Sequence, residues 1–262
     1  MESSALVLGA GGITGVAWQL GILVGLADQG VDLGQADLIL GTSAGAMTGA
    51  LVAAFRDPRV AAAIEAPLGP GDPPLKADWD RGPIAFGLLQ DETLDPAEMR
   101  RRIGALALEA EVGPPEPWLE AFARRLPVEG WPRPLVVTAV DAATGEPVAW
   151  DADSGVPLVP AVTASCAVPC IFPPIPVDGS RYMDGGVRSR TNADLAAGHD
   201  TVYVLAPRMP LMQREALTDP TVTLIEPDDE AMDAIGGNVF DAGRWEQVMA
   251  AAERQGRGLR LQ

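Results

Sequence analysis

The sequence predicts an α/β protein with a mainly parallel sheet covered by helices on both faces. Short apolar runs alternate along the chain with longer alanine-rich segments, as in βα units. The run at residues 201–206 is continuously apolar, which is typical of a parallel strand buried on both faces. The chain has 262 residues and is 47% hydrophobic, so it can bury one large core. We therefore expect a single domain over residues 1–262.

The first predicted strand, residues 6–8, leads into a glycine loop at residues 9–15, which reads Gly-Ala-Gly-Gly-Ile-Thr-Gly. A helix is predicted to follow over residues 16–29. Successive glycines allow backbone N–H groups to converge on an anionic oxygen, so the loop suits an oxyanion site. The alternative is a dinucleotide loop with Asp28 or Asp32 as the ribose-binding acid, although Thr14 stands where that motif has glycine.

The second predicted strand, residues 36–40, is followed by Gly41-Thr42-Ser43-Ala44-Gly45 and by a helix-like run at residues 46–54. A serine on such a strand–turn–helix junction is exposed at the end of a sheet, beside the amides of a helix N-terminus. We therefore predict that Ser43 is a nucleophile. The alternative is a serine that only caps the helix.

An insertion is predicted between this unit and the next strand. It covers residues 66–132, opens with the proline- and glycine-rich stretch 66–74, and contains helix-like stretches at residues 96–111 and 116–126. Such a segment beside an active site commonly acts as a lid or a substrate wall, and the alternative is a plain connector. Several aromatic side chains here could line an acyl pocket or pack in the core: Trp79, Phe86, Trp118, Phe122 and Trp131.

Two carboxylates compete for the role of general base. Asp141 follows the apolar run 136–140 and precedes a second extended run, so it is expected to start a hairpin loop. Asp184 ends the run at residues 180–183 and precedes two glycines, which indicates an acid at a strand end. Asp184 is the better candidate, and an ordinary Asp-Gly turn is the alternative.

A Ser-His-Asp triad is not expected. The chain has one histidine, His199, and it precedes the predicted strand at residues 201–206. Chemistry in open α/β sheets gathers at the carboxyl ends of the strands. Since a six-residue strand spans about 20 Å, His199 is expected on the wrong side of the sheet. A carboxylate must then serve as the base.

Four motifs in this order resemble the patatin-like phospholipases: the glycines at residues 11–15, the turn at 41–45, the small-residue and proline segment at 164–174, and Asp184-Gly185-Gly186. The resemblance runs from about residue 6 to 206 and is thin between 55 and 133. It implies a three-layer α/β/α fold and a Ser–Asp dyad that transfers the acyl group of a lipid ester to serine. By this resemblance Ser43 is the nucleophile, Asp184 is the base, and the oxyanion hole consists of the amides of Gly11, Gly12 and Ile13.

The chain departs from the family pattern at three positions. Ala10 replaces a usual glycine, and no proline follows Asn192. Thr14 stands where the family usually has lysine or arginine, so a neutral ester becomes an expected substrate alongside a phospholipid. None of these positions belongs to the dyad.

The net charge of −17 limits the classes of partner that the protein can bind. Nucleic acids and anionic membranes repel such a surface. We expect a lipid or small ester substrate, no nucleic acid, and at most transient contact with a membrane or micelle.

The uncharged stretch at residues 3–27 is interrupted by glycines, and Glu2 is acidic. Neither a transmembrane helix nor a secretion signal is therefore predicted, and a cytoplasmic location is expected. Cys166 and Cys170 are expected to be buried thiols. Two cysteines and one histidine do not make a metal site, so no metal or cofactor is expected.

The expected function is that of a serine hydrolase acting on lipid esters through an acyl-serine intermediate. A nucleotide-binding oxidoreductase, a non-catalytic scaffold and an acyltransferase remain as alternatives. The segment at residues 225–229 and the helix predicted up to residue 257 are expected to be a final strand and a packing helix, with no assigned function.

Overall fold

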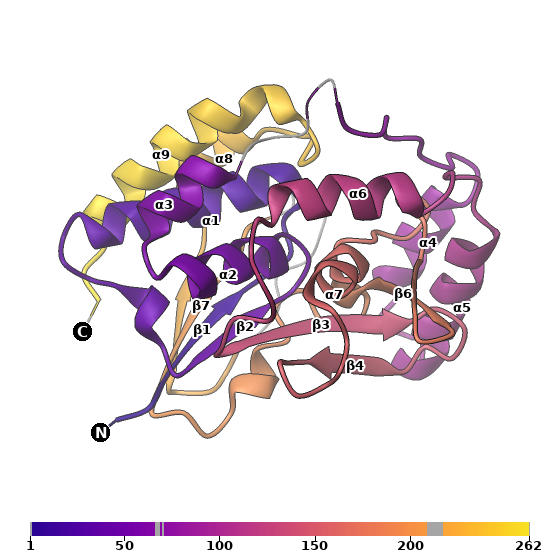
Figure 1. The fold of residues 1–262 in the computed structure, drawn as a ribbon, viewed down its shortest axis with the longest axis horizontal. Helices are drawn as coiled ribbons and strands as arrows, with labels where there is room; N and C mark the ends of the chain where they lie inside the picture. The colour runs from indigo at the N-terminus through magenta and orange to yellow at the C-terminus, as the bar shows by residue number, and fades with distance from the viewer. Residues whose placement is uncertain (1, 66–68, 70, 209–216, 262) are drawn as a thin grey trace.

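The computed structural model describes residues 2–65, 69, 71–208 and 217–261, and its centre is a mixed sheet of eight described strands (Figure 1). Five strands are parallel in the order β3–β2–β1–β7–β8. Their bounds are β1 Ser4–Leu8, β2 Leu38–Gly41, β3 Leu135–Asp141, β7 Thr201–Leu205 and β8 Val222–Ile225. The antiparallel strands are β4 Pro147–Trp150, β5 Ile175–Val177 and β6 Ser180–Asp184.

Strand β3 pairs with three partners, and this arrangement positions the site. The hairpin strand β4 pairs with residues 137–140 of β3. Some of the β3 residues that pair with β4 also pair with β2 or with β6. A strand has only two edges, so β2 and β6 must both lie on the edge of β3 opposite β4. There β2 pairs with residues 135–137 and β6 with residues 139–141. Two strands of opposite direction thus lie end to end along one edge of β3.

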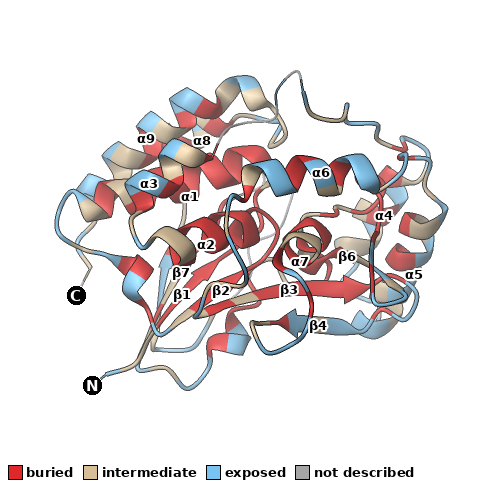
Figure 2. Ribbon diagram, viewed as in Figure 1, coloured by how far each residue is buried: buried red, intermediate tan, exposed pale blue. Residues whose placement is uncertain are grey.

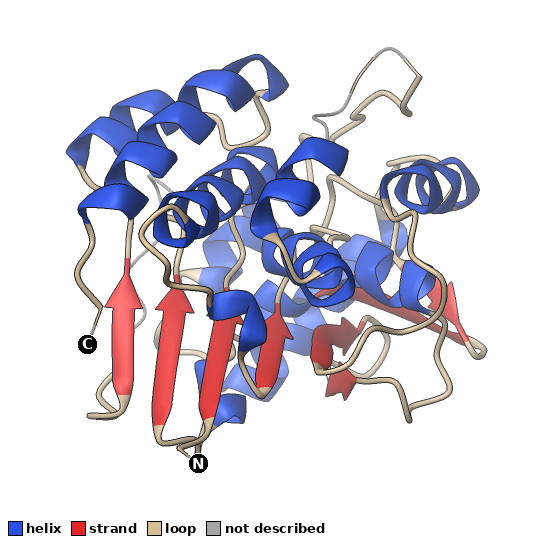
Figure 3. Ribbon diagram, turned by 60° about the vertical axis from the view of Figure 1, so that its left-hand side comes forward, coloured by secondary structure: helices blue, strands red, loops and turns tan. Residues whose placement is uncertain are grey.

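Helices cover both faces of the sheet, and the three-layer α/β/α fold is confirmed (Figure 3). Alternate side chains of each strand point to opposite faces. Leu6, Leu8 and Ile39 belong to the large core beneath α1 (Gly12–Ala27), α2 (Ala44–Phe55) and α9 (Trp245–Gly258). Val7 and Leu40 join the smaller cluster beneath the short helix η3 (Ala193–Ala196). Figure 2 shows that α1 and α2 are buried nearly all round, while α5 and α9 have exposed outer faces.

Nine α-helices lie in the described part of the chain. Those packed around the large core are α1 Gly12–Ala27, α2 Ala44–Phe55, α3 Pro58–Ile64, α6 Glu116–Arg125, α7 Leu158–Ser165, α8 Asp229–Ile235 and α9 Trp245–Gly258. Helices α4 Gly82–Leu89 and α5 Pro96–Glu109 pack on the other face, against Val140 of β3 and Met183 of β6. The short helix η3 is Ala193–Ala196.

The predicted elements differ from the observed ones mainly at their ends. Helix α1 begins four residues earlier than predicted, because the Gly15 N–H donates to the Gly11 carbonyl (2.9 Å) and closes the first turn inside the glycine loop. Within the predicted insertion, α5 and α6 match the expected helices, whereas α4 was not predicted. Residues 66–68 and 70 of that insertion lie outside the described residues.

The close pairing of α1 and α9 depends on glycine, which generates a prediction for stability. A Cβ on Gly25 would lie 2.3 Å from the Glu253 carbonyl oxygen. We expect Gly25→Ala to lower the free energy of unfolding by about 1–3 kcal/mol, because overpacking outweighs the gain of about 1 kcal/mol in helix propensity. Denaturant titration measures the change.

Gly87 is the matched control for Gly25→Ala. It also lies inside a helix, but a Cβ there would meet nothing within 4 Å. Gly87→Ala should leave the free energy of unfolding unchanged or raise it by up to about 1 kcal/mol. Equal effects of the two substitutions would show that helix packing does not set the cost.

Candidate active site

Ser43 occupies a strained turn between β2 and α2. Its backbone has φ 55° and ψ −118°, which an L-residue rarely adopts. The flanking glycines are required by close approach: a Cβ on Gly45 would lie 1.8 Å from the Leu8 carbonyl oxygen, and one on Gly41 would lie 2.6 Å from Ala46 Cα. The turn therefore projects Ser43 at the carboxyl end of β2, as the sequence predicted.

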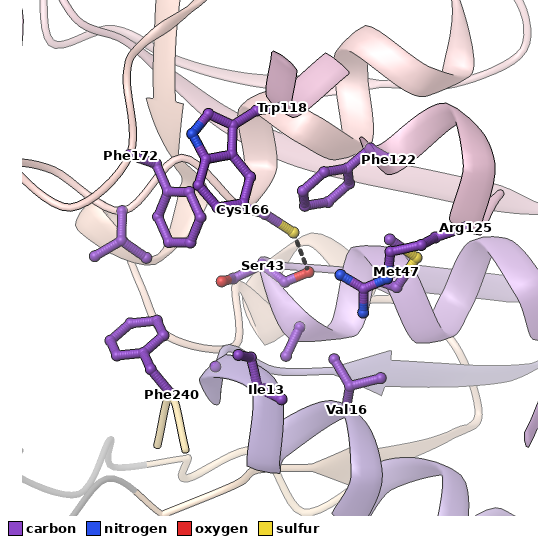
Figure 4. Close-up of a pocket in the computed structure, with 13 residues that line it drawn as sticks. Ile13, Val16, Ser43, Met47, Trp118, Phe122, Arg125, Cys166, Phe172 and Phe240 are labelled. Carbon is purple, nitrogen blue, oxygen red and sulfur yellow. Dashed lines mark hydrogen bonds between the residues drawn. The ribbon is translucent and has the colours of Figure 1, made fainter. Parts of the chain in front are cut away.

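The last residues of the α7 segment hold the backbone of Ser43. The Ser43 N–H donates to Ser165 Oγ at 2.9 Å. The Cys166 thiol donates to the Ser43 carbonyl oxygen at 3.1 Å, drawn as the dashed line in Figure 4. Burial raises the pKa of the Cys166 thiol well above its ordinary value, and the nearby Asp184 carboxylate raises it further. This cysteine is therefore a neutral hydrogen-bond donor.

The strand register brings Ser43 and Asp184 together. Gly41, the end of β2, pairs with Val137, and Asp184, the end of β6, pairs with Ala139. Both carboxyl ends therefore converge on Thr138 from opposite directions. The two side chains line one cavity, and the Ser43 hydroxyl lies close enough to Asp184 to lower the pKa of its carboxyl.

A buried polar network lies behind this junction. Thr42 Oγ1 and Thr138 Oγ1 are 2.8 Å apart. The Asn192 side-chain amide donates to Thr42 Oγ1 at 3.0 Å and to the Gly185 carbonyl oxygen at 3.3 Å. The network therefore links the residue before Ser43 to the residue after Asp184, which fixes their separation.

The Asp184 carboxyl is nearly completely buried, with 4% of the residue exposed. Burial raises its pKa to about 7, although hydrogen bonds from the Ser43 side chain and the Gly186 N–H lower it. Asp184 Oδ1 accepts the Gly186 N–H at 2.7 Å. Oδ2 is buried and accepts no hydrogen bond of ordinary distance and angle from the described residues.

The glycine loop presents unused backbone donors beside the two side chains. The Gly15 and Thr14 N–H groups donate to the carbonyls of Gly11 and Val239, at 2.9 and 3.1 Å. The N–H groups of Gly11, Gly12 and Ile13 have no acceptor among the described residues. They stand at the N-terminus of α1, where the helix dipole favours negative charge. This stretch can therefore bind an anionic oxygen.

The other candidates from the sequence lie elsewhere. Asp141 caps the β3–β4 hairpin, with Oδ1 accepting the N–H groups of Ala143 and Thr144 at 2.8 and 2.9 Å. Burial alone would raise the pKa of Asp141, but these backbone donors hold it below its ordinary value. His199 precedes β7 at the amino end of the sheet, where Thr201 pairs with Ser4. This is the side opposite Ser43, as expected.

The carboxylates of the dinucleotide alternative do not lie at the glycine loop. Asp28 follows the last residue of α1, about 24 Å along the helix from the loop. It forms ion pairs with Arg59 and Arg257, at 2.6 and 2.9 Å. Asp32 caps the short helix Leu33–Gln35 by accepting the Gly34 N–H. Both carboxylates have structural roles.

Several residues of the site were not predicted from the sequence. Phe240 and Val239 line the cavities at Ser43 from the segment between α8 and α9, to which the sequence assigned no function. The available signal was the glycine pair at residues 236–237, which is unfavourable inside a helix and lies just before Val239 and Phe240. Ser165 and Cys166 were missed because their contact with Ser43 spans more than 120 residues.

Four of the five aromatic residues of the insertion take one of the two expected roles, and Trp79 takes neither. Phe86, Trp118 and Phe122 line the cavities beside Ser43. Trp79 is 81% exposed, and Trp131 packs at the core edge with its Nε1–H donating to the Leu135 carbonyl (3.0 Å).

Within the described ranges, no cluster of three or more His, Cys, Asp or Glu side chains could hold a metal ion. No helix among those ranges has both the length and the apolar character needed to cross a bilayer.

The chain was compared with protein families and with solved structures. Residues 6–197, most of the chain, match the model of the patatin-like phospholipases. The fold is similar to that of VipD from Legionella pneumophila, at 17% identity and a TM-score of 0.46, over 82% of this chain and 51% of VipD. It is similar to the type III effector protein ExoU at 17% identity and a TM-score of 0.40, over 97% of this chain and 54% of ExoU. This chain thus spans about half the length of each. No curated protein matches the sequence.

The burial of Asp184 predicts a pH-dependent stability. Its folded-state pKa lies above the unfolded value of 3.8, so ionising it costs stability as the pH rises from about 4 to about 7. In Asp184→Asn the side-chain amide cannot ionise, and its oxygen can still accept the Gly186 N–H. We expect this substitution to raise Tm by several degrees at pH 8, with a smaller gain at pH 5. Calorimetric scans at both pH values measure it, and equal shifts at the two would contradict the raised pKa.

The hydrogen bond from the Ser43 N–H to Ser165 Oγ predicts a second effect on stability. Ser165→Ala leaves the buried Ser43 N–H without an acceptor and should lower the free energy of unfolding by about 1–3 kcal/mol. Thr48→Val is the control, because the buried Thr48 hydroxyl has no partner among the described residues. That change should be neutral or stabilising in denaturant titration. If Ser165→Ala is as mild as the control, Ser165 does not support the turn.

Proposed function

The chain belongs to the patatin-like phospholipase family, and from this premise we propose that it is a serine hydrolase that cleaves carboxylic ester bonds of lipids. One observation carries the proposal. Ser43, on its strained turn, shares a cavity with a buried carboxyl whose pKa is raised to about 7 by burial. A hydroxyl nucleophile beside a base whose pKa is close to neutral pH is the arrangement that acyl transfer to serine requires.

In the proposed acylation step, Ser43 Oγ attacks the ester carbonyl while Asp184 takes the hydroxyl proton. The tetrahedral intermediate collapses when the bond between carbon and the alcohol oxygen breaks. Asp184 returns the proton to that oxygen, and the alcohol leaves. Water then attacks the acyl-Ser43 ester with Asp184 as base, which releases the acid and restores the serine.

The environment of Asp184 suits the role of general base. An unperturbed aspartate has a pKa near 3.9 and is a weak base at neutral pH. Burial raises the pKa of Asp184 to about 7, so the carboxylate is present above neutrality and binds a proton more tightly than a solvated aspartate does. General-base catalysis is most effective when the pKa of the base is close to the operating pH, and burial brings the pKa of Asp184 into that range.

We assign the oxyanion hole to the N–H groups of Gly11, Gly12 and Ile13. They have no acceptor in the described part of the chain, and Gly12 lines both cavities that reach Ser43. Each well-placed donor is worth about 3–4 kcal/mol of transition-state stabilisation.

We also propose that the insertion at residues 66–132 is a substrate wall within a single domain. Its helices α4 and α6 supply Phe86, Trp118 and Phe122 to the cavities. The net charge of −17 favours neutral micelles and dispersed esters over anionic membranes, in keeping with a cytoplasmic enzyme that contacts lipid transiently. An acyltransferase would share every step up to acyl-Ser43, with an alcohol in place of water.

The dyad generates a prediction for turnover. Ser43→Ala should abolish hydrolysis of a p-nitrophenyl ester, and Asp184→Asn should lower kcat/KM by at least about 100-fold, in the range expected for loss of a general base. Initial rates measured by nitrophenolate release test both. A fluorophosphonate probe should label Ser43 in the unsubstituted protein, whereas a non-catalytic scaffold would stay unlabelled.

His199→Ala is the control for these variants. His199 lies at the opposite side of the sheet, with Nδ1 2.9 Å from the Ala196 carbonyl oxygen. Its loss should leave kcat/KM within a few-fold of the original value. A loss as large as that of Asp184→Asn would instead implicate a triad.

A further inference from the structure

Two cavities meet at Ser43, and they differ in the helix that walls them. The first, which we name the α6 lobe, is walled by Trp118 and Phe122 of α6 with Phe172. The second, the α4 lobe, is walled by Phe86 and Leu89 of α4 with Val187. Four residues line both lobes: Gly12, Ser43, Val168 and Phe240.

The general base separates the two lobes chemically, because Asp184 lines the α4 lobe and is absent from the lining of the α6 lobe. In the proposed acylation, the proton from Ser43 passes through Asp184 to the oxygen of the departing alcohol. That oxygen must therefore lie on the side of Asp184, and the acyl carbon chain extends to the other side. The alcohol then occupies the α4 lobe, and the acyl chain occupies the α6 lobe.

The walls of the α6 lobe suit an acyl chain. Its lining is aromatic and aliphatic apart from Ser43, the Cys166 thiol and Arg125. The Arg125 guanidinium is ion-paired with Glu65, whose side chain is fully buried. In Figure 4 the Ser43 hydroxyl points toward the side of Phe172 and Phe240, away from Arg125. The side of the lobe with Phe172 and Phe240 is therefore the side that the Ser43 hydroxyl faces.

The walls of the α4 lobe suit an uncharged, apolar alcohol. Apart from Ser43, its polar lining residues are Gln90, Asp184 and Arg190, and the others are apolar or glycine. A phosphate group on the leaving alcohol would lie in the same lobe as the Asp184 carboxylate. Like charges repel strongly where water is scarce, so an anion beside Asp184 would hinder ionisation of the base. Arg190 is the cation of this lining, but it already has an interaction partner within the protein.

We propose that the substrate class is a neutral ester with an apolar group on each side of the carbonyl, the acyl chain in the α6 lobe and the alcohol in the α4 lobe. This inference rests on the proposed serine hydrolase function and adds the direction in which the substrate lies. Leu89 and Phe86 then determine alcohol preference, while Phe122 and Val16, which also lines the α6 lobe, determine acyl-chain preference.

Two ester series test the assignment. One varies the alcohol from ethanol to decanol on octanoic acid, and the other varies the acid from acetic to dodecanoic on ethanol. Leu89→Trp narrows the α4 lobe and should lower kcat/KM for decyl octanoate at least 10-fold relative to ethyl octanoate, with the acyl-chain preference unchanged. Val16→Phe narrows the α6 lobe and should shift the acyl-chain optimum by at least two carbons, with the alcohol preference unchanged.

Each of these variants is the control for the other, and Phe86→Ala and Phe122→Leu widen the same lobes if a larger side chain prevents folding. A reversed pattern, or no selective shift in folded variants, overturns the lobe assignment. A preference of more than 10-fold for phosphatidylcholine micelles over neutral esters of the same acid overturns the substrate class.

Fluorophosphonate labelling distinguishes a failure of the lobe assignment from a failure of the proposed serine hydrolase function. If Ser43 is labelled and esters are hydrolysed, only the lobe assignment falls, whereas an unlabelled Ser43 with no ester turnover refutes both.

Discussion

The burial of one carboxyl beside one strained serine is the constraint on which the site depends. Ser43 and Asp184 meet because β2 and β6 run toward each other along the same edge of β3 and end on either side of Thr138. A wholly parallel sheet could not produce this junction, because the carboxyl ends of two strands on one edge can point toward each other only if the strands run in opposite directions. The antiparallel strand β6 is therefore the element that places a carboxylate at the carboxyl end of β2.

This junction is unfavourable by itself, and the surrounding structure stabilises it. Ser43 has a positive φ, and Asp184 is buried with a raised pKa. Several interactions offset these costs: Ser165 and Cys166 bind the backbone of Ser43, the Gly186 N–H binds Asp184, and Asn192 links Thr42 to Gly185. Strain concentrated at one turn and held by contacts from distant segments is typical of sites where the geometry serves a reaction.

The sequence predicted what local chemistry determines. The turn at residues 41–45 requires glycines on both sides of Ser43, and the run 201–206 is apolar throughout, so the elbow and a buried strand were both recognisable. Asp184 could be selected, but the antiparallel pairing of β6 and the burial that shifts its pKa depend on register, which no local pattern encodes. Three features were missed for the same reason, because each depends on contacts between remote segments. They are helix α4, the hydrogen bond between Ser43 and Ser165, and the position of Phe240 beside the site.

The most direct test is the rate at which an organophosphonate modifies Ser43 across the pH range 5–9, with the adduct located by peptide mass spectrometry. If Asp184 activates Ser43, the rate constant rises with pH along a single titration with a pKa near 7, the value to which burial raises the Asp184 carboxyl. The same profile should be flat and at least about 100-fold lower in Asp184→Asn, in line with the contribution of a general base. A rate that does not depend on pH, or one that survives the substitution, would contradict the account.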